Sequence, residues 1–428
     1  MKDIKQHSLS ILIALLFSVI VISVFVIIKQ ATSVTETYMV TNIPQAVFYV
    51  EQFNVQHKRY KIHCIYEENL DRLQESNSRK KFPSLILGNN ILTDKILSQL
   101  DDISYLFATL SISRSNFYES LLQSGMMKNK QLLLPVSFNI PMVIMQKKTD
   151  ESITEPGVVL QLPELKKLSN SSTVNQKNEY LAMGFHPLWS DEALNYFIKA
   201  FGVSFTEENG LHWNNANFSS ALYYLQTWFD DSRITFSNIM AFKQKYEQIP
   251  ADMQLSLKKT NAWVISSKKY LALDESRRSS LITYWFAHDN KIPVDNSAVF
   301  LGILSNGKSK EAAEVFIKWF YQFDTQKKLL EQLRLYRLDE IDFGIANGFS
   351  AIVDITEKIF PLYYKELLGK APPKQMIAMV NGVSQSWDSF FSKYIVPIIY
   401  EWFTAEEPFD INSRITQEYI NWKKSVQP

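Results

Sequence analysis

The chain has 428 residues, with 45 lysines and arginines against 44 aspartates and glutamates, and 46% of its residues are hydrophobic. This length predicts about two or three domains, and the composition is typical of a globular rather than a disordered protein. The balanced charge and the lack of a long basic block argue against a nucleic-acid binder. We therefore expect a globular chain with two lobes and no nucleic-acid partner.

The N-terminus contains a long uncharged segment. Residues Leu9 to Ile28 form a run of twenty residues without a charge, preceded by Lys2 and Lys5. A helix needs about 20 apolar residues to cross a membrane core, whereas the apolar part of a cleaved signal is shorter, about 7 to 15 residues. We predict a hydrophobic helix in residues 1–33 that acts as a signal anchor, with the rest of the chain outside the cytoplasm. A removed signal peptide is the alternative, because Ala31 to Ser33 are small.

Strand-like runs then alternate with amphipathic segments. This alternation is typical of βαβ units around a largely parallel sheet. Ligands of such sheets bind beyond the carboxyl ends of the strands, and Asn42, Asn89 and Asn90 stand at strand ends. The first expected elements are strands over 36–42, 59–68 and 82–90 and a helix over 43–57.

Cys64, in the second expected strand, is the only cysteine. It has no intramolecular disulfide partner, and its apolar neighbours predict an inert buried thiol.

The segment Leu132 to Lys148 is apolar and strand-like but contains polar residues at positions expected to be buried. Ser137 and Asn139 stand beside Pro135 and Pro141. Polar side chains next to prolines often satisfy local backbone groups. The alternative is that they face a ligand.

Helices are predicted further along the chain, over 183–202, 217–231 and 309–333. In the first of them, Ser190 is an expected N-cap and Gly202 an expected left-handed stop. Asp191 and Glu192 then complement the positive end of the helix dipole.

The order of several segments resembles the extracellular solute-binding proteins of family 1, the sugar-type receptors of ABC importers, with maltose-binding protein as a familiar member. The most specific segment is "AVFLGILSNGKSKEAAEVFIKWFYQFDTQKKLLE", and the resemblance covers most of residues 37–428. The other matching segments are "FPSLILGNN", "KNKQLLLPVSFNIPMVIMQKK", "LPELKKLSN" and "KTNAWVISSKKYLAL".

This resemblance implies an α/β fold of the two-lobed, periplasmic-binding-protein-like kind, class II type, with hinge strands between the lobes. Lobe 1 would comprise residues 34–145 and 299–345, and lobe 2 residues 146–298 and 346–428. The implied crossings lie near Val143 to Lys147, Phe300 to Leu304 and Phe343 to Phe349.

The function implied by the resemblance is capture of a small polar solute, most simply a carbohydrate, in the cleft between the lobes. The solute would be delivered to the permease subunits of an ABC importer by a monomeric receptor held at the membrane. The family's Asp, Gly and Trp positions hold Ser84, Ser267 and Tyr270 here. These departures leave open an alternative, a membrane-anchored scaffold or sensor that kept the fold without transport.

Aromatic rings cover the flat faces of sugars while amides and hydroxyls bind the sugar hydroxyls. Four aromatic residues lie outside obvious helix stripes, and for each of them a packing role in the core is the alternative. Together with the polar residues they complete the predicted ligand-binding set: Asn42, Asn89, Asn90, Ser137, Asn139, Trp189, Tyr270, Trp285 and Trp387.

No catalytic motif accompanies these residues. The six histidines are scattered, and the sequence has no HExxH, CxxC, GxSxG, P-loop or GxGxxG motif. We therefore predict a binding protein and not an enzyme, with no metal and no cofactor.

Overall fold

The computed structural model describes residues 34–73, 82–108, 112–147, 158–176, 179–207, 210–340, 342–378 and 382–426. The hydrophobic helix predicted over Leu9 to Ile28 lies outside these residues, so the anchor stays a prediction. Among the helices of the described ranges, none combines the length and the apolar character that a membrane span requires.

One half of the molecule is built on a six-stranded sheet with the strand order β14-β6-β13-β3-β1-β2, here called the large sheet. β1 runs parallel to β2 and β3, whereas β13 is antiparallel to both β3 and β6. The strands at 36–42, 59–68 and 82–90 are therefore confirmed, but the sheet is mixed rather than parallel. Its strands are β1 (Thr35–Thr41), β2 (Tyr60–Tyr66), β3 (Leu85–Asn89), β6 (Leu133–Phe138), β13 (Val299–Ile303) and β14 (Phe349–Ser350).

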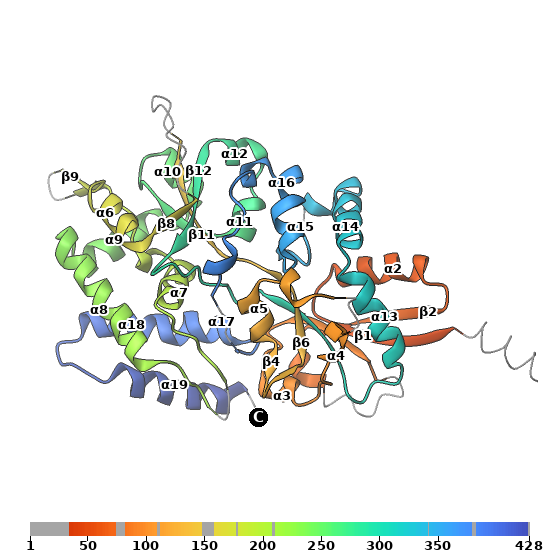
Figure 1. Cartoon of the computed structure of the whole chain (residues 1–428). Helices are drawn as coiled ribbons and strands as arrows, with labels where there is room; N and C mark the ends of the chain where they lie inside the picture. Colours follow the sequence, from red (N-terminus) through yellow and green to blue (C-terminus); the bar gives the residue numbers. More distant parts are fainter. Residues whose placement is uncertain are drawn as a thin grey trace, which may run out of the picture.

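Helices cover this sheet on the right of Figure 1. The sequence predicted one helix over 309–333, and the structure divides it at Tyr321 and Gln322. The elements of this half are α2 (Ala46–Gln56), α3 (Asp94–Leu97), α4 (Tyr105–Ala108), α5 (Glu119–Ser124), the hairpin β4 (Met126–Met127) and β5 (Lys130–Gln131), α13 (Lys310–Phe320), α14 (Phe323–Leu335), α15 (Val353–Lys358) and α16 (Phe360–Tyr363).

The other half is built on a four-stranded sheet with the strand order β11-β7-β12-β8, here called the small sheet. The strands are β7 (Pro141–Gln146), β8 (Val159–Gln161), β11 (Trp263–Ser266) and β12 (Leu281–Ala287). The further elements are α6 (Leu162–Asn170), β9 (Val174–Gln176), β10 (Glu179–Ala182), α7 (Asp191–Ala200), α8 (Asn215–Ser232), α9 (Phe236–Tyr246), α10 (Ala251–Ser256), α11 (Ser267–Leu271), α12 (Glu275–Ser279), α17 (Trp387–Phe390), α18 (Val396–Thr404) and α19 (Ile411–Val426).

The chain passes from the large sheet to the small sheet between Phe138 and Pro141, the first passage, and it returns between Ala287 and Val299, the second passage. It crosses a third time, to the small-sheet half, between α16 and α17. The first passage lies a few residues before the one predicted near Val143 to Lys147. Residues Phe343 to Phe349 lead into β14, which still pairs with β6 in the large sheet. The lobe boundaries given above stay a prediction.

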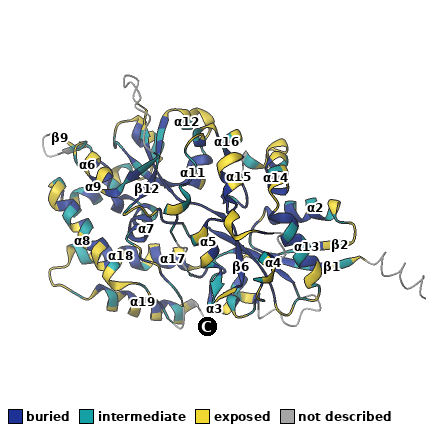
Figure 2. Ribbon diagram, in the orientation of Figure 1, coloured by how far each residue is buried: buried dark blue, intermediate teal, exposed yellow. Residues whose placement is uncertain are grey.

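Two hydrophobic cores account for most of the buried apolar residues. Because side chains alternate along a strand, the small sheet takes part in both cores. Val143 and Phe286 pack with α7 and α8, whereas Ile144 and Trp285 join the core that contains the large sheet. In Figure 2 most of the central strands of both sheets are dark blue and the outer helices carry much yellow, whereas the edge strand β2 is only partly buried.

Candidate functional site

Asn139 lies at the first passage between the sheets and is 1% exposed. Its Nδ2 donates to Ser297 Oγ at 3.0 Å and to the backbone oxygen of Asn347 at 2.9 Å, and its Oδ1 accepts from Ser267 Oγ at 2.9 Å. Ser297 lies on the second passage, and Asn347 precedes β14. One amide therefore joins both passages, and none of its polar groups is left for a solute.

Ser137, two residues before Asn139, is also buried and bonded within the protein. Its hydroxyl is buried and donates to the backbone oxygen of Ala346 at 3.2 Å. The partners of Ser137 and Asn139 are therefore distant in sequence rather than local. Ser137 thus ties β6 to the segment before β14 within the large-sheet half, whereas Asn139 holds the junction of the two sheets.

Two of the three asparagines predicted at strand ends, Asn42 and Asn89, contact one another. Asn42 Nδ2 donates to Asn89 Oδ1 at 2.8 Å, and the Asn89 backbone N–H donates to Asn42 Oδ1 at 3.2 Å. Asn90 adopts a left-handed conformation, φ 55°, and its Nδ2 lies 3.4 Å from the backbone oxygens of Val383 and Ser384. Val383 belongs to the core of the small-sheet half, so Asn90 links the two halves.

The four aromatic candidates are buried, with exposures of 4%, 1%, 1% and 0% for Trp189, Tyr270, Trp285 and Trp387. Trp387 packs against Phe205, with ring centroids 4.8 Å apart. In this conformation the four aromatic residues make the contacts of core residues. A packing role was the alternative that the sequence left open for each of them. No aromatic candidate presents a ring face to solvent in this conformation.

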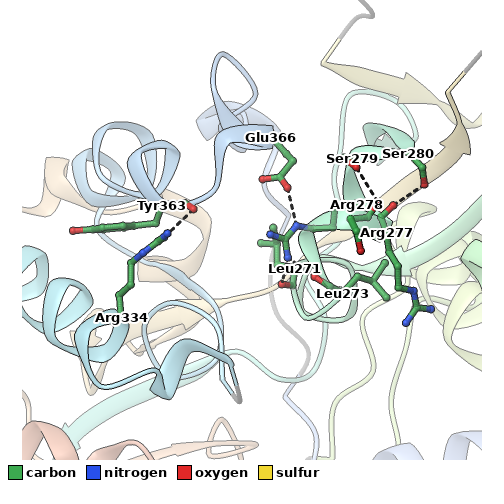
Figure 3. Close-up of polar contacts among 10 residues, drawn as sticks. Leu271, Leu273, Arg277, Arg278, Ser279, Ser280, Arg334, Tyr363 and Glu366 are labelled. Carbon is green, nitrogen blue, oxygen red and sulfur yellow. Dashed lines mark hydrogen bonds and ion pairs between the residues drawn. The ribbon is translucent and has the colours of Figure 1, made fainter. Parts of the chain in front are cut away.

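A second link between the halves lies around α16 and the residues that follow it (Figure 3). Arg278, at the end of α12, donates from Nε to Glu366 Oε1 at 2.7 Å, and its Nη1 donates to the backbone oxygen of Leu271 at 2.9 Å. From the other side, Arg334 of α14 donates to the backbone oxygen of Tyr363 at 3.1 Å. One arginine from each half therefore holds this region, Arg334 at the last residue of α16 and Arg278 at Glu366 just after the helix.

A polar pocket of about 340 Å³ lies beside the junction. It is formed by the start of α7, the start of α11, the second passage and the residues around α17. None of the nine predicted residues lines it. The lining residues are Asp191, Glu192, Asn195, Tyr196, Ser266, Lys268, Lys269, Asp295, Asn296, Ser297, Asp388, Phe391 and Ser392.

The sequence placed two of these residues correctly without recognising the pocket. Ser190 caps α7 as predicted, since its Oγ accepts from the Ala193 backbone N–H at 3.0 Å. Asp191 and Glu192 therefore stand in the first helical turn, where acidic residues are expected for electrostatic reasons alone. Their position gave no separate signal for binding.

The second passage supplies the charged floor of the pocket. Asp295 accepts from the Ser297 backbone N–H at 2.8 Å and from Tyr196 Oη at 3.3 Å, and burial raises the pKa of this carboxyl. Lys199 lies beneath it, and its Nζ donates to Asn296 Oδ1 at 2.8 Å. Burial lowers the pKa of Lys199 to about 8. Hydrogen bonds to fixed partners thus hold these groups in place.

The pocket offers both acceptors and donors of hydrogen bonds to a solute, because carboxylates, lysines and serine hydroxyls line it. Asn296 Nδ2 donates to Asp388 Oδ1 at 2.7 Å, which leaves the second carboxylate oxygen of Asp388 for another donor. Asn195 Oδ1 is buried and has no hydrogen-bond partner among the described residues. Within the ranges that the structure describes, no three metal-ligating side chains gather in one place. The geometry suits a neutral solute that carries several hydroxyl groups.

Two mixed α/β halves, joined by short passages and with a polar pocket at their junction, form the architecture of the two-lobed solute-binding proteins. Solved structures of that class bear this out. The sugar-binding protein MalE from Xanthomonas citri is similar with a TM-score of 0.65 at 10% identity, over 92% of this chain and 99% of that chain. The cyclic alpha-maltosyl-1,6-maltose binding protein from Arthrobacter globiformis is similar with a TM-score of 0.63 at 12% identity, over 91% of this chain and 99% of that chain.

A family 1 extracellular solute-binding protein from Alicyclobacillus acidocaldarius is also similar, with a TM-score of 0.58 at 12% identity, over 92% of this chain and 99% of that chain. No family model and no curated protein sequence matches the chain. At such low identities the likeness establishes the fold. The two-lobed α/β fold that the sequence predicted is thereby confirmed.

Proposed function

We propose that the chain is the substrate-binding component of an ABC importer and captures a carbohydrate between its lobes. The observation that carries this proposal is the polar pocket of about 340 Å³ beside the junction of the lobes, which is lined by residues of the small-sheet half and of the second passage. Similar structures are described as a maltodextrin-binding protein with maltotetraose and as a solute-binding protein with maltose. They support a saccharide as the first class of ligand to test.

The lining and the volume of the pocket indicate which kind of saccharide it could hold. Carboxylate and amide oxygens accept hydrogen bonds from sugar hydroxyls, and Asp191, Asn195 and Asp388 supply such oxygens. The volume is at the lower end of the range usual for small-molecule sites, which favours a mono- or disaccharide. Since the predicted aromatic residues are packed in the cores, hydrogen bonds rather than ring stacking would supply most of the specificity.

In this proposal the lobes rotate about the passages that join them, and the solute favours the closed form because it binds that form better. Asn139 holds both passages at one point, so it stands where such a rotation would be centred. The predicted N-terminal helix would keep the receptor at the outer face of the membrane and raise its effective concentration for the permease. The receptor would act as a monomer.

The second candidate function is a membrane-anchored scaffold or sensor that keeps the fold without transport. It is favoured by the burial of Trp189, Tyr270, Trp285 and Trp387, because none of these four predicted residues lines the pocket. The two functions differ in whether a small solute binds at all.

Isothermal titration calorimetry with a panel of mono- and disaccharides tests the proposal. We expect one saccharide to bind the wild-type protein, and we expect Asn195→Ala to weaken that binding about tenfold, or about 1.4 kcal/mol. The variant loses a side chain that lines the pocket and whose buried Oδ1 has no hydrogen-bond partner among the described residues. The exposed Asn116 supplies a matched control, Asn116→Ala, which should bind normally. If no saccharide binds the wild type, the scaffold or sensor is the better account.

A further inference from the structure

A second groove, of about 710 Å³, lies between the two lobes and apart from the pocket described above. Its large-sheet side is formed by residues that follow β2 and β3, and its small-sheet side by residues after α7 and by α19. The lining residues are Asp71, Thr93, Lys95, Glu207, Gly210, Leu211, His212, Ser384, Thr416, Tyr419, Ile420, Lys423 and Lys424.

The lobes touch directly beside this groove. Asn90 Nδ2 lies 3.4 Å from the backbone oxygens of Val383 and Ser384. A Cβ atom on Gly382 would lie 2.9 Å from the backbone oxygen of Leu92, so the two backbones meet without room for a side chain. The groove is therefore present only while the lobes are together.

Two carboxylates from opposite lobes line the groove. Glu207 is held on the small-sheet side, where its Oε2 accepts from the Ser384 backbone N–H at 2.9 Å, and its side chain is only 5% exposed. Asp71 is held on the large-sheet side, where Thr93 Oγ1 donates to its Oδ1 at 3.4 Å. Each carboxylate is held by a group of its own lobe, and closure brings Asp71 and Glu207 to the same groove.

Lysines on both sides of the groove partly offset the negative charges of Asp71 and Glu207. Lys423 of α19 lies 3.5 Å from Glu207 Oε1, and Lys95 lies on the same lobe as Asp71. The other charged or titratable groups that line the groove are His212, Tyr419 and Lys424. Burial is the main cause that raises the pKa of Asp71, Glu207 raises it further, and Lys95 and Lys423 lower it, with a net upward direction.

We propose that closure of the two lobes takes up a proton at Asp71, so that acid favours the closed form. This inference rests on the lobe rotation of the proposed function. Separation of the lobes would return water to Asp71 and move Glu207 away, because these two groups belong to different lobes. Asp71 would then behave as an ordinary exposed carboxyl.

The sign of the effect follows from linkage. An exposed aspartate has a pKa near about 4, and the pKa of Asp71 in the closed form lies above that of an ordinary aspartate. Over the interval between the two values the closed form binds more protons than the open form, so the closed-to-open ratio rises as the pH falls. For one proton the limit is about tenfold per pH unit.

The distance between the lobes reports closure directly. Spin labels at the exposed positions Lys58→Cys and Ser220→Cys, one on each lobe, can be placed in a Cys64→Ser background and measured by pulsed dipolar spectroscopy. Between about pH 7.5 and about pH 4.5 we expect the closed fraction of the full-length protein to rise in acid. Asp71→Asn, which mimics the protonated carboxyl, should remove this dependence and stay closed throughout.

Neighbouring charges should move the transition in opposite directions. Glu207→Gln keeps an acceptor for the Ser384 N–H but removes the opposing charge, so the transition should shift to lower pH. Lys423→Gln removes a stabilising cation and should shift it to higher pH. Asp230→Asn, at an exposed aspartate of α8, should match the wild type.

Repeating the series with a saturating saccharide separates this inference from the proposed function. A closed fraction that does not change with pH, in a protein that still closes with sugar, would overturn proton uptake and leave the proposed function standing. Closure by acid without any response to sugar would overturn the proposed function and leave proton uptake at Asp71 standing. If circular dichroism shows that Asp71→Asn does not fold, Glu207→Gln and Lys423→Gln test proton uptake instead. Opposite shifts of their closure transitions would support proton uptake at Asp71, and identical transitions in both variants would reject it.

Discussion

Replacement of Trp387 by alanine should lower the free energy of unfolding by about 3 to 5 kcal/mol, as expected for removal of a large buried aromatic side chain. Trp387 is 0% exposed and packs against Phe205, Phe390 and Phe391, with ring centroids between 4.8 and 6.4 Å away. The loss of these contacts leaves a cavity in the core of the small-sheet lobe. Urea unfolding followed by tryptophan fluorescence and circular dichroism measures the change.

Trp387→Phe is the matched variant. The indole Nε1 of Trp387 has no hydrogen-bond partner among the described residues, so phenylalanine loses volume but no hydrogen bond. Trp387→Phe should lower the free energy of unfolding by much less than Trp387→Ala does. The sequence alone predicted a sugar platform at this position, in which case alanine would abolish sugar binding and leave the stability of the free protein almost unchanged. That outcome would restore Trp387 to the binding site.

Asn139→Ala should have the second large effect, a loss of about 3 kcal/mol of unfolding free energy. The substitution removes three hydrogen bonds and leaves the Ser297 hydroxyl, the Ser267 hydroxyl and the Asn347 carbonyl with fewer partners in a buried junction. Because these bonds connect both passages, the lobes should also become less well fixed relative to one another. Denaturant unfolding and hydrogen exchange at residues 139–140 and 295–297 would measure both effects.

Asn116→Ala, at an exposed position before β6, serves as the control and should leave the unfolding free energy nearly unchanged. If Asn139→Ala is as stable as this control but no longer binds the solute, Asn139 contacts the ligand instead. The structural account of the junction would then be wrong.

Local pattern was sufficient to predict much of the fold. The strand at Leu85 to Leu87 was predictable because this apolar run is short, aliphatic and followed by the polar residues Asn89 and Asn90. The start of α7 was predictable from Ser190, whose cap is a contact over three residues. What the sequence missed in the fold was the interruption at Tyr321 and Gln322, where the helical pattern continues across the break.

The site was less predictable, for physical reasons that differ between residues. Nothing in the local sequence distinguishes a buried tryptophan from a ligand-facing one, since the burial of Trp387 depends on Phe205, far away in the chain. The polar character of Asn139 was noticed, but its partners Ser267 and Ser297 are 128 and 158 residues away. Asp191 and Glu192 were indistinguishable from ordinary first-turn acids. Tertiary contacts alone bring the pocket together.

A crystal structure of the protein with the saccharide that calorimetry identifies is the most direct test of the central claim, that a carbohydrate binds at the junction of the lobes. The account predicts one sugar in the pocket of about 340 Å³, with its hydroxyls donating to oxygens of Asp191, Asn195 or Asp388. A sugar that instead lies on an outer surface, with no contact to these residues, would contradict it.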